Sequence, residues 1–225
     1  MIKLITTTAA IIAVSIPNNA IAAPNQPVRS IQQNDKATMA NLDQAVDQWI
    51  ADIRLALAAF RNVNKDDQER ALALDNLIAK LKSAAYKCRK GGKLDDEVVQ
   101  AISLCLKRAE FASQYAQKSG LSQDRVDRYL ALANIFKGQA GQIDEIRNEI
   151  ISMQTAFGDY QVDLTEDRQL FIVEIAANET KEAQARLDRV AGDMKKVMGM
   201  LGDLKAKPAE IVAIRYGNKV AVNTK

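Results

Sequence analysis

Hydrophobic residues recur every three or four positions over most of the chain between residues 35 and 207. The first segment with this spacing covers about residues 35 to 61 and includes Leu42, Val46, Trp49 and Ile53. Side chains three and four positions apart lie on the same face of an α-helix. The pattern therefore predicts a series of helices that pack along apolar stripes of the coiled-coil type.

Four more helices are predicted, separated by residues that favour turns and helix ends. We expect them at about residues 66–90, 94–119, 123–157 and 164–205. Gly91-Gly92 and Gly120 mark two of the boundaries, and Gly158-Asp159-Tyr160 is expected to form the turn before the last helix. At a rise of 1.5 Å per residue, the last two helices would each be about 50 to 60 Å long. The predicted fold class is therefore all-α, as an elongated antiparallel bundle or set of coiled-coil hairpins of about five helices.

The C-terminal segment, residues 208–225, has a different pattern. Pro208 is expected to end the last helix, because proline lacks the N–H group that an interior helical residue donates. Two runs rich in β-branched residues flank Gly217-Asn218, which predicts a small β-hairpin, with an extended tail as the alternative. An isolated hairpin is marginal in water, so it would pack on the bundle or pair with a strand of another chain.

Some residues of the C-terminal part are candidates for contacts with a partner. The segment around Met194 and Met198 is rich in methionine, which suits adaptable binding surfaces, although core packing is the alternative at this spacing. The predicted hairpin adds further apolar side chains. The candidate partner-binding residues are Met194, Met198, Ile211, Ile214, Tyr216 and Val220.

The N-terminus has the layout of a secretory signal peptide over residues 1–22. Lys3 precedes an apolar run of about 13 residues, shorter than the roughly 20 that a spanning helix needs. Ala20 and Ala22 supply the small residues of a cleavage site. Residues 23–34, with two prolines and several amides, are expected to form a flexible leader before the helical domain of residues 35–207. The protein is therefore expected to be exported, to a periplasm or to the outside.

Composition excludes several kinds of site. Histidine is absent, so catalysis by Ser-His-Asp or Cys-His groups and zinc sites built from Cys and His are excluded. Neither a GxGxxG nor a GxxxxGK[ST] motif occurs. The net charge is only +3, which favours neither nucleic acid nor an anionic membrane as a partner. No catalytic, metal-binding or cofactor-binding residue is predicted, and we do not expect an enzyme.

Cys88 and Cys105 are the two cysteines of the chain. Exported proteins usually oxidise such a pair, so we expect a disulfide bond between them. The alternative is a pair of buried free thiols, since both residues lie on apolar faces. A simple hairpin folded at Gly91-Gly92 would leave them about 15 Å apart along the helices. The bond therefore requires the second helix to end early and a loop to climb beside the third.

The sequence as a whole favours a non-enzymatic helical interaction or structural protein. A subunit or accessory of a cell-envelope assembly, such as a secretion or conjugation apparatus, fits these features, and so does a chaperone. The expected partners are proteins of the envelope, and uncovered apolar faces would also allow a homo-oligomer. The alternative is a small-ligand-binding or sensory bundle, in which Gly138 and Gly141 open space between helices.

Overall fold

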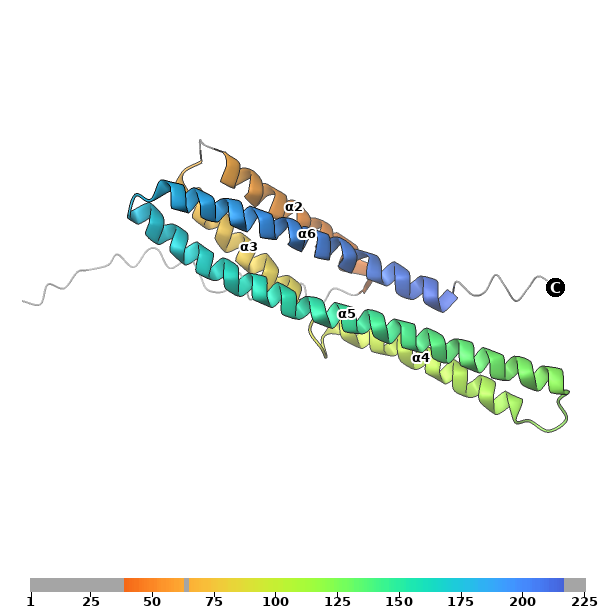
Figure 1. Ribbon diagram of the computed structural model, residues 1–225. Coiled ribbons are helices and arrows are strands. Elements are labelled where there is room, and N and C mark those ends of the chain that lie inside the picture. The colour runs from red at the N-terminus through yellow and green to blue at the C-terminus, as the bar shows by residue number, and fades with distance from the viewer. Residues whose placement is uncertain (1–38, 63–64, 217–225) are drawn as a thin grey trace, which may run out of the picture.

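The computed structural model describes residues 39–62 and 65–216 and confirms an all-α bundle of long helices (Figure 1). A single 3₁₀ turn, η1, precedes five α-helices. Their bounds are Met39–Asn41 for η1, Leu42–Arg61 for α2, Asp67–Lys87 for α3, Lys93–Ala116 for α4, Gln123–Ala176 for α5 and Thr180–Tyr216 for α6. The predicted signal peptide and leader lie outside the described residues.

Helix α5 is 54 residues long, which corresponds to about 80 Å, and its neighbours change along its length. Helix α4 packs against its N-terminal half, whereas α3 and most of α6 pack against its C-terminal half, and the end of α6 reaches Gln139 of α5 (Figure 1). Helix α2 contacts α3 and α6. The molecule therefore consists of a four-helix bundle of α2, α3, α6 and the C-terminal half of α5, from which a two-helix hairpin of α4 and α5 projects.

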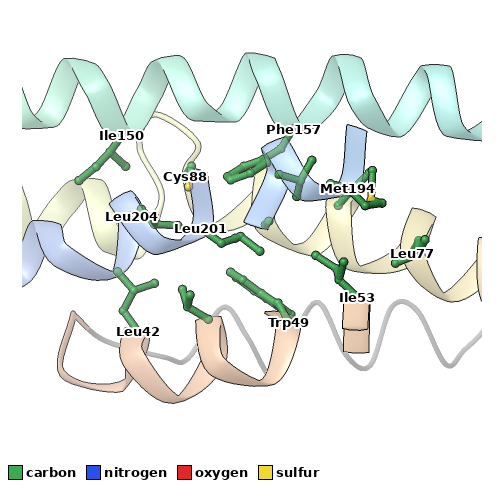
Figure 2. Packing of buried hydrophobic residues seen from close by; sticks show 14 of the residues in the cluster. Leu42, Trp49, Ile53, Leu77, Cys88, Ile150, Phe157, Met194, Leu201 and Leu204 are labelled. Carbon is green, nitrogen blue, oxygen red and sulfur yellow. The ribbon is translucent and has the colours of Figure 1, made fainter. Parts of the chain in front are cut away.

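The core of the bundle receives side chains from all four of its helices (Figure 2). Trp49 and Ile53 of α2 approach Phe157 of α5 and Leu201 of α6 in the interior, and all four are almost completely buried. Full burial of such side chains contributes about 1.5–3 kcal/mol each. The apolar stripes predicted from the three- and four-residue spacing are thus the surfaces that hold the bundle together.

The turn expected at Gly158-Asp159-Tyr160 is wrong, because α5 continues through it. Ile150, Phe157, Leu164 and Phe171 follow one another at intervals of seven and are all buried. The apolar face therefore keeps its phase on both sides of Gly158. A glycine in a helix interior costs only about 1 kcal/mol, less than the burial of any one of these side chains contributes.

The turn before α6 lies at Asn178, which has a positive φ of 62°. The N–H group of Glu179 donates to the carbonyl of Glu174 at 2.7 Å, and that of Asn178 donates to the carbonyl of Ile175 at 3.0 Å. These two bonds form a Schellman motif, which satisfies carbonyl groups at the end of α5. Asparagine serves here because, after glycine, it tolerates the left-handed conformation best.

The expectation that Pro208 ends the last helix is also wrong, since α6 continues to Tyr216. Residues 208–216 are helical rather than part of a β-hairpin, and residues 217–225 lie outside the described part. Contacts with α5 hold the helix on both sides of the proline. Before it, Lys207 Nζ lies 2.6 Å from Glu149; beyond it, Ile211 is buried and Gln139 Nε2 donates to the carbonyl of Ile214 at 2.6 Å. Tertiary packing, rather than local preference, stabilises most helices in proteins.

Replacement of Gly158 by alanine tests the continuity of α5. An added Cβ at this position would meet no atom within 4 Å. The variant Gly158→Ala should therefore raise the free energy of unfolding by about 0.5–1 kcal/mol, measured by chemical denaturation. The matched control is Gly120→Ala, where a φ of +82° should make the substitution destabilising by about 1 kcal/mol. Destabilisation by Gly158→Ala would indicate a turn instead.

Candidate interaction surface

The hairpin of α4 and the N-terminal half of α5 leaves apolar side chains exposed. The two helices bury a shared seam that includes Cys105 and Ala109 of α4 and Ala133 and Ile143 of α5. Each helix covers only one face of the other, and the end of α6 contacts α5 as far toward the hairpin tip as Gln139, which donates to the carbonyl of Ile214. The exposed large apolar residues of the hairpin are Val99, Leu104, Leu106, Phe111 and Tyr115 on α4 and Leu130 and Ile135 on α5.

One side of the hairpin combines apolar residues with cations, and we call it the basic flank. Helical spacing places Leu104, Arg108, Phe111 and Tyr115 in one row of α4, and Arg125, Arg128 and Ile135 in one row of α5. The rings of Tyr115 and Tyr129 lie 5.7 Å apart and join the two rows. Lys118 Nζ lies 3.8 Å from the Tyr115 ring centroid and belongs to the same flank. Phe111, 61 % exposed, stands at its centre.

The opposite side, the acidic flank, combines apolar residues with carboxylates. The same spacing places these residues away from the basic flank. Its members are Val99, Leu106 and Glu110 of α4 and Asp127, Leu130, Asp144 and Glu145 of α5. Glutamines on the same helices donate to two of the carboxylates, Gln114 to Glu110 at 3.1 Å and Gln123 to Asp127 at 2.9 Å.

Each flank also contains a charge of the opposite sign. Lys137 lies on the acidic flank, and Glu97 lies on the basic flank. Glu97 is engaged within the molecule, since it accepts a hydrogen bond from the N–H group of Met39 at 2.7 Å. The net sign of each flank is therefore set by the larger set of charges named above.

An ion pair fixes the hairpin at its root. Asp95, in the first turn of α4, is only 5 % exposed, and it accepts hydrogen bonds from Arg147 Nε of α5 at 2.6 Å and from the Gly91 N–H group at 2.8 Å. The bond to Arg147 lowers the pKa of the Asp95 carboxyl below its ordinary value, against the effect of burial. Gly91 itself has a φ of 70°, which favours glycine. The loop, the start of α4 and the middle of α5 are thus held together.

The residues predicted to contact a partner lie mostly in the interior. Met194 and Ile211 are buried in the core, and Met198 and Ile214 pack against it with partial exposure. Tyr216 is partly exposed at the end of α6, and Val220 lies outside the described residues. The methionine-rich segment therefore serves in core packing. Sequence reasoning missed the hairpin flanks, although Leu104 and Phe111 fall outside the apolar stripe of α4 and were a usable signal.

Cys88 and Cys105 are free thiols, so the predicted disulfide bond is not formed in this structure. Both side chains are buried, at 1 % and 0 % exposure. Helices α3 and α4 do not fold back on each other at Gly91-Gly92, because both run antiparallel to α5, with Asp75 beside Arg168 and Asp95 beside Arg147. Cys105 lies well inside α4 and therefore further along α5 than Cys88, and the climbing loop that the bond requires does not occur. Burial raises the pKa of Cys88 to about 12, which keeps it protonated and unreactive near neutral pH.

Two surface grooves flank the C-terminal half of α5. One, of about 400 Å³, lies between α5 and α6 and is lined mainly by charged residues: Asp163, Glu166, Asp167, Leu170, Arg186, Arg189 and Asp193. Arg186 binds both Glu174 and Asp167 and lowers the pKa of the Glu174 carboxyl. The second groove, of about 390 Å³, lies between α3 and α5 and is lined by Leu72, Phe171 and Ile172 among others.

The glycines considered as openings between helices do not have that role. A Cβ added at Gly138 or Gly141 would meet nothing within 4 Å, and both residues are exposed. Across residues 39–62 and 65–216, no cluster of His, Cys, Asp and Glu is arranged to hold a metal ion. No helix in the same ranges is both long enough and apolar enough to cross a bilayer.

No protein-family model, curated protein or solved structure matches this chain. Within the described molecule, the two helices of the hairpin carry seven of the fifteen large apolar side chains that are exposed. Contiguous exposed apolar surface of this kind marks interaction sites more often than isolated exposed residues do. The hairpin is therefore the candidate interaction surface.

Replacement of Asp95 by asparagine tests the root of the hairpin. The variant Asp95→Asn should lower the free energy of unfolding at pH 7 by about 2 kcal/mol, because Arg147 loses its charged partner. Because the pKa of Asp95 is lowered in the folded protein, its contribution to the free energy of unfolding is complete above about pH 4. That contribution is lost as the pH falls through the pKa that Asp95 has in the folded state. Urea denaturation between pH 7 and pH 2 measures both effects. The exposed neighbour provides the control, since Asp96→Asn should change stability by less than about 0.5 kcal/mol.

Thiol labelling tests the state of the two cysteines. Native protein treated with iodoacetamide near neutral pH should gain no label, because both thiols are buried and that of Cys88 stays protonated. Unfolded protein should gain a label on each, as mass spectrometry would show. A chain purified from its native compartment that takes up label only after reduction would contradict the free-thiol state.

Proposed function

We propose that the chain is an exported, non-enzymatic interaction or structural protein whose α4–α5 hairpin binds a protein partner in the cell envelope. A subunit or accessory of an envelope assembly, such as a secretion or conjugation apparatus, or a chaperone, would use such a surface. The residues 1–22 support export by their signal-peptide pattern. The bundle supports a structural role, since its core is continuous and its helices are long.

The observation that carries the proposal is the exposure of Phe111 at the centre of an apolar row on a projecting hairpin. Leu104 and Tyr115 lie in the same row, and Ile135 lies on the neighbouring row of α5. A soluble monomer has no use for this row in its own folding, because the buried seam of the hairpin lies elsewhere. Aromatic residues surrounded by cations are typical of the central contacts of protein interfaces.

The groove between α3 and α5 supports the alternative of a small-ligand-binding or sensory bundle. Its volume of about 390 Å³ falls in the range that small ligands occupy. Phe171 closes its floor in the core, while Leu72 and Ile172 are exposed at its sides. The hairpin surface is favoured over the groove because it carries seven exposed large apolar side chains, whereas Leu72 and Ile172 are the exposed large apolar side chains that line the groove.

Site-specific photo-crosslinking tests the hairpin surface. A photoreactive phenylalanine analogue at position 111 of the full chain, irradiated in intact cells that make the protein, should yield a defined protein adduct that mass spectrometry identifies. The matched control is the same analogue at position 55 of α2, where Leu55 is 69 % exposed on the bundle rather than the hairpin. The proposal fails if position 111 gives no adduct or gives only those that position 55 gives. An additional Glu substitution at Arg128 should reduce a specific adduct several-fold.

A further inference from the structure

We propose that copies of this chain associate through the hairpin, with the basic flank of one copy against the acidic flank of the next. This inference rests on the assignment of the hairpin as the interaction surface. It names the partner as a second copy of the same chain, and it deepens the proposed function from an interaction surface to an assembly contact.

Opposite charges on the two flanks make them complementary. Arg125 and Arg128, on the basic flank near the hairpin tip, are exposed, and so are Glu110 and Asp127 on the acidic flank. Arg108 and Lys118 extend the positive charge, and Glu145 extends the negative charge, whereas Asp144 lies 3.7 Å from the Arg147 guanidinium. Charges arranged in this way steer association and select the register of the partner. Two basic flanks, or two acidic flanks, would instead repel each other.

Exposed apolar residues accompany the charges on both flanks. Phe111 and Tyr115 stand between the arginines of the basic flank, and Leu106 and Leu130 stand among the carboxylates of the acidic flank. An apolar centre with a charged rim is the usual arrangement of a specific protein interface. Flank-to-flank contact would surround each helix pair with another and so bury the apolar rows, as neighbouring helices do in a four-helix bundle.

A second copy of the chain would pair the charges and cover the apolar residues of both flanks, whereas other partners would do so for one flank at most. An anionic polymer would neutralise the arginines but leave Glu110, Asp127 and Leu130 exposed beside its own charge. An apolar partner would leave both sets of charges unpaired. Because the two flanks differ, the contact between copies is heterologous, and it leads to a ring or to an open chain of subunits.

Paired charge reversals test the contact in the full chain. One variant carries Arg125→Glu and Arg128→Glu, which makes both flanks acidic, and the other carries Glu110→Lys and Asp127→Lys, which makes both basic. Each variant alone should associate at least about tenfold more weakly than the wild type in sedimentation velocity. An equimolar mixture of the two should recover association, because acidic and basic flanks can again alternate. Association of the wild type and of the mixture should weaken as salt increases.

A control variant separates the contact from total charge. Lys181→Glu with Lys195→Glu makes the same change in net charge as the arginine variant, on exposed positions of α6 away from the hairpin. It should associate like the wild type. Circular dichroism on each variant checks that the helices are intact, which is expected because all the substituted side chains are exposed.

Several outcomes would overturn the inference, and they are distinct from failure of the proposed function. A wild-type chain that remains monomeric at every concentration, or a mixture that does not recover association, excludes the flank-to-flank contact. If the chain is monomeric while crosslinking at position 111 identifies a different protein, the proposed function stands and the inference fails. If the wild type is monomeric and binds heparin through the arginines, a polyanion rather than a second copy occupies the basic flank.

Discussion

The continuity of α5 is the constraint on which the rest of the structure depends. One helix from Gln123 to Ala176 is longer than any of its neighbours, so no single partner covers it. Its C-terminal half has α3 and α6 on two sides, and the bundle core forms there. Its N-terminal half has α4 as its main partner, which gives a hairpin with one buried seam and two open flanks. The shape of the molecule and the location of its exposed apolar surface follow from this difference.

The junction between bundle and hairpin is where the partner of α5 changes from α3 to α4. The loop at Gly91-Gly92 joins α3 to α4, which both run antiparallel to α5, and the direction of α4 would be free to vary if nothing fixed it. Asp95 binds the Gly91 N–H group and the Arg147 side chain, and so ties the loop to the middle of α5. About two turns nearer the N-terminus of α5, the Gln139 side chain donates to the carbonyl of Ile214 near the end of α6. Both contacts hold the hairpin in a fixed position relative to the bundle.

The all-α fold and most of the core could be predicted from the sequence, because the apolar spacing reports which face of each helix is buried. The wrong predictions concern Gly158 and Pro208, where a local preference for a turn or helix end competes with tertiary packing. Phe157, Leu164 and Ile211 are buried across these positions, and their burial outweighs the local cost. The predicted disulfide bond rested on the expected compartment rather than on geometry. Helix α4 continues along α5 in the direction of α3, which places Cys105 away from Cys88. Periodicity also does not report which helices lack further neighbours, so the hairpin flanks were missed.

The exposed charged side chains and the exposed apolar rows are the features of this surface that another molecule could contact. In the bundle, cations and carboxylates of different helices are paired with each other, as in Lys80–Asp52 and Arg168–Asp75. On the hairpin beyond the Asp95–Arg147 pair at its root, most cations lie on one flank and most carboxylates on the other, with the two helices between them. Charges separated in this way can attract opposite charges on a neighbouring molecule. Exposed ion pairs alone contribute little to association in water. The apolar side chains between those charges would add the buried apolar area that a stable interface needs.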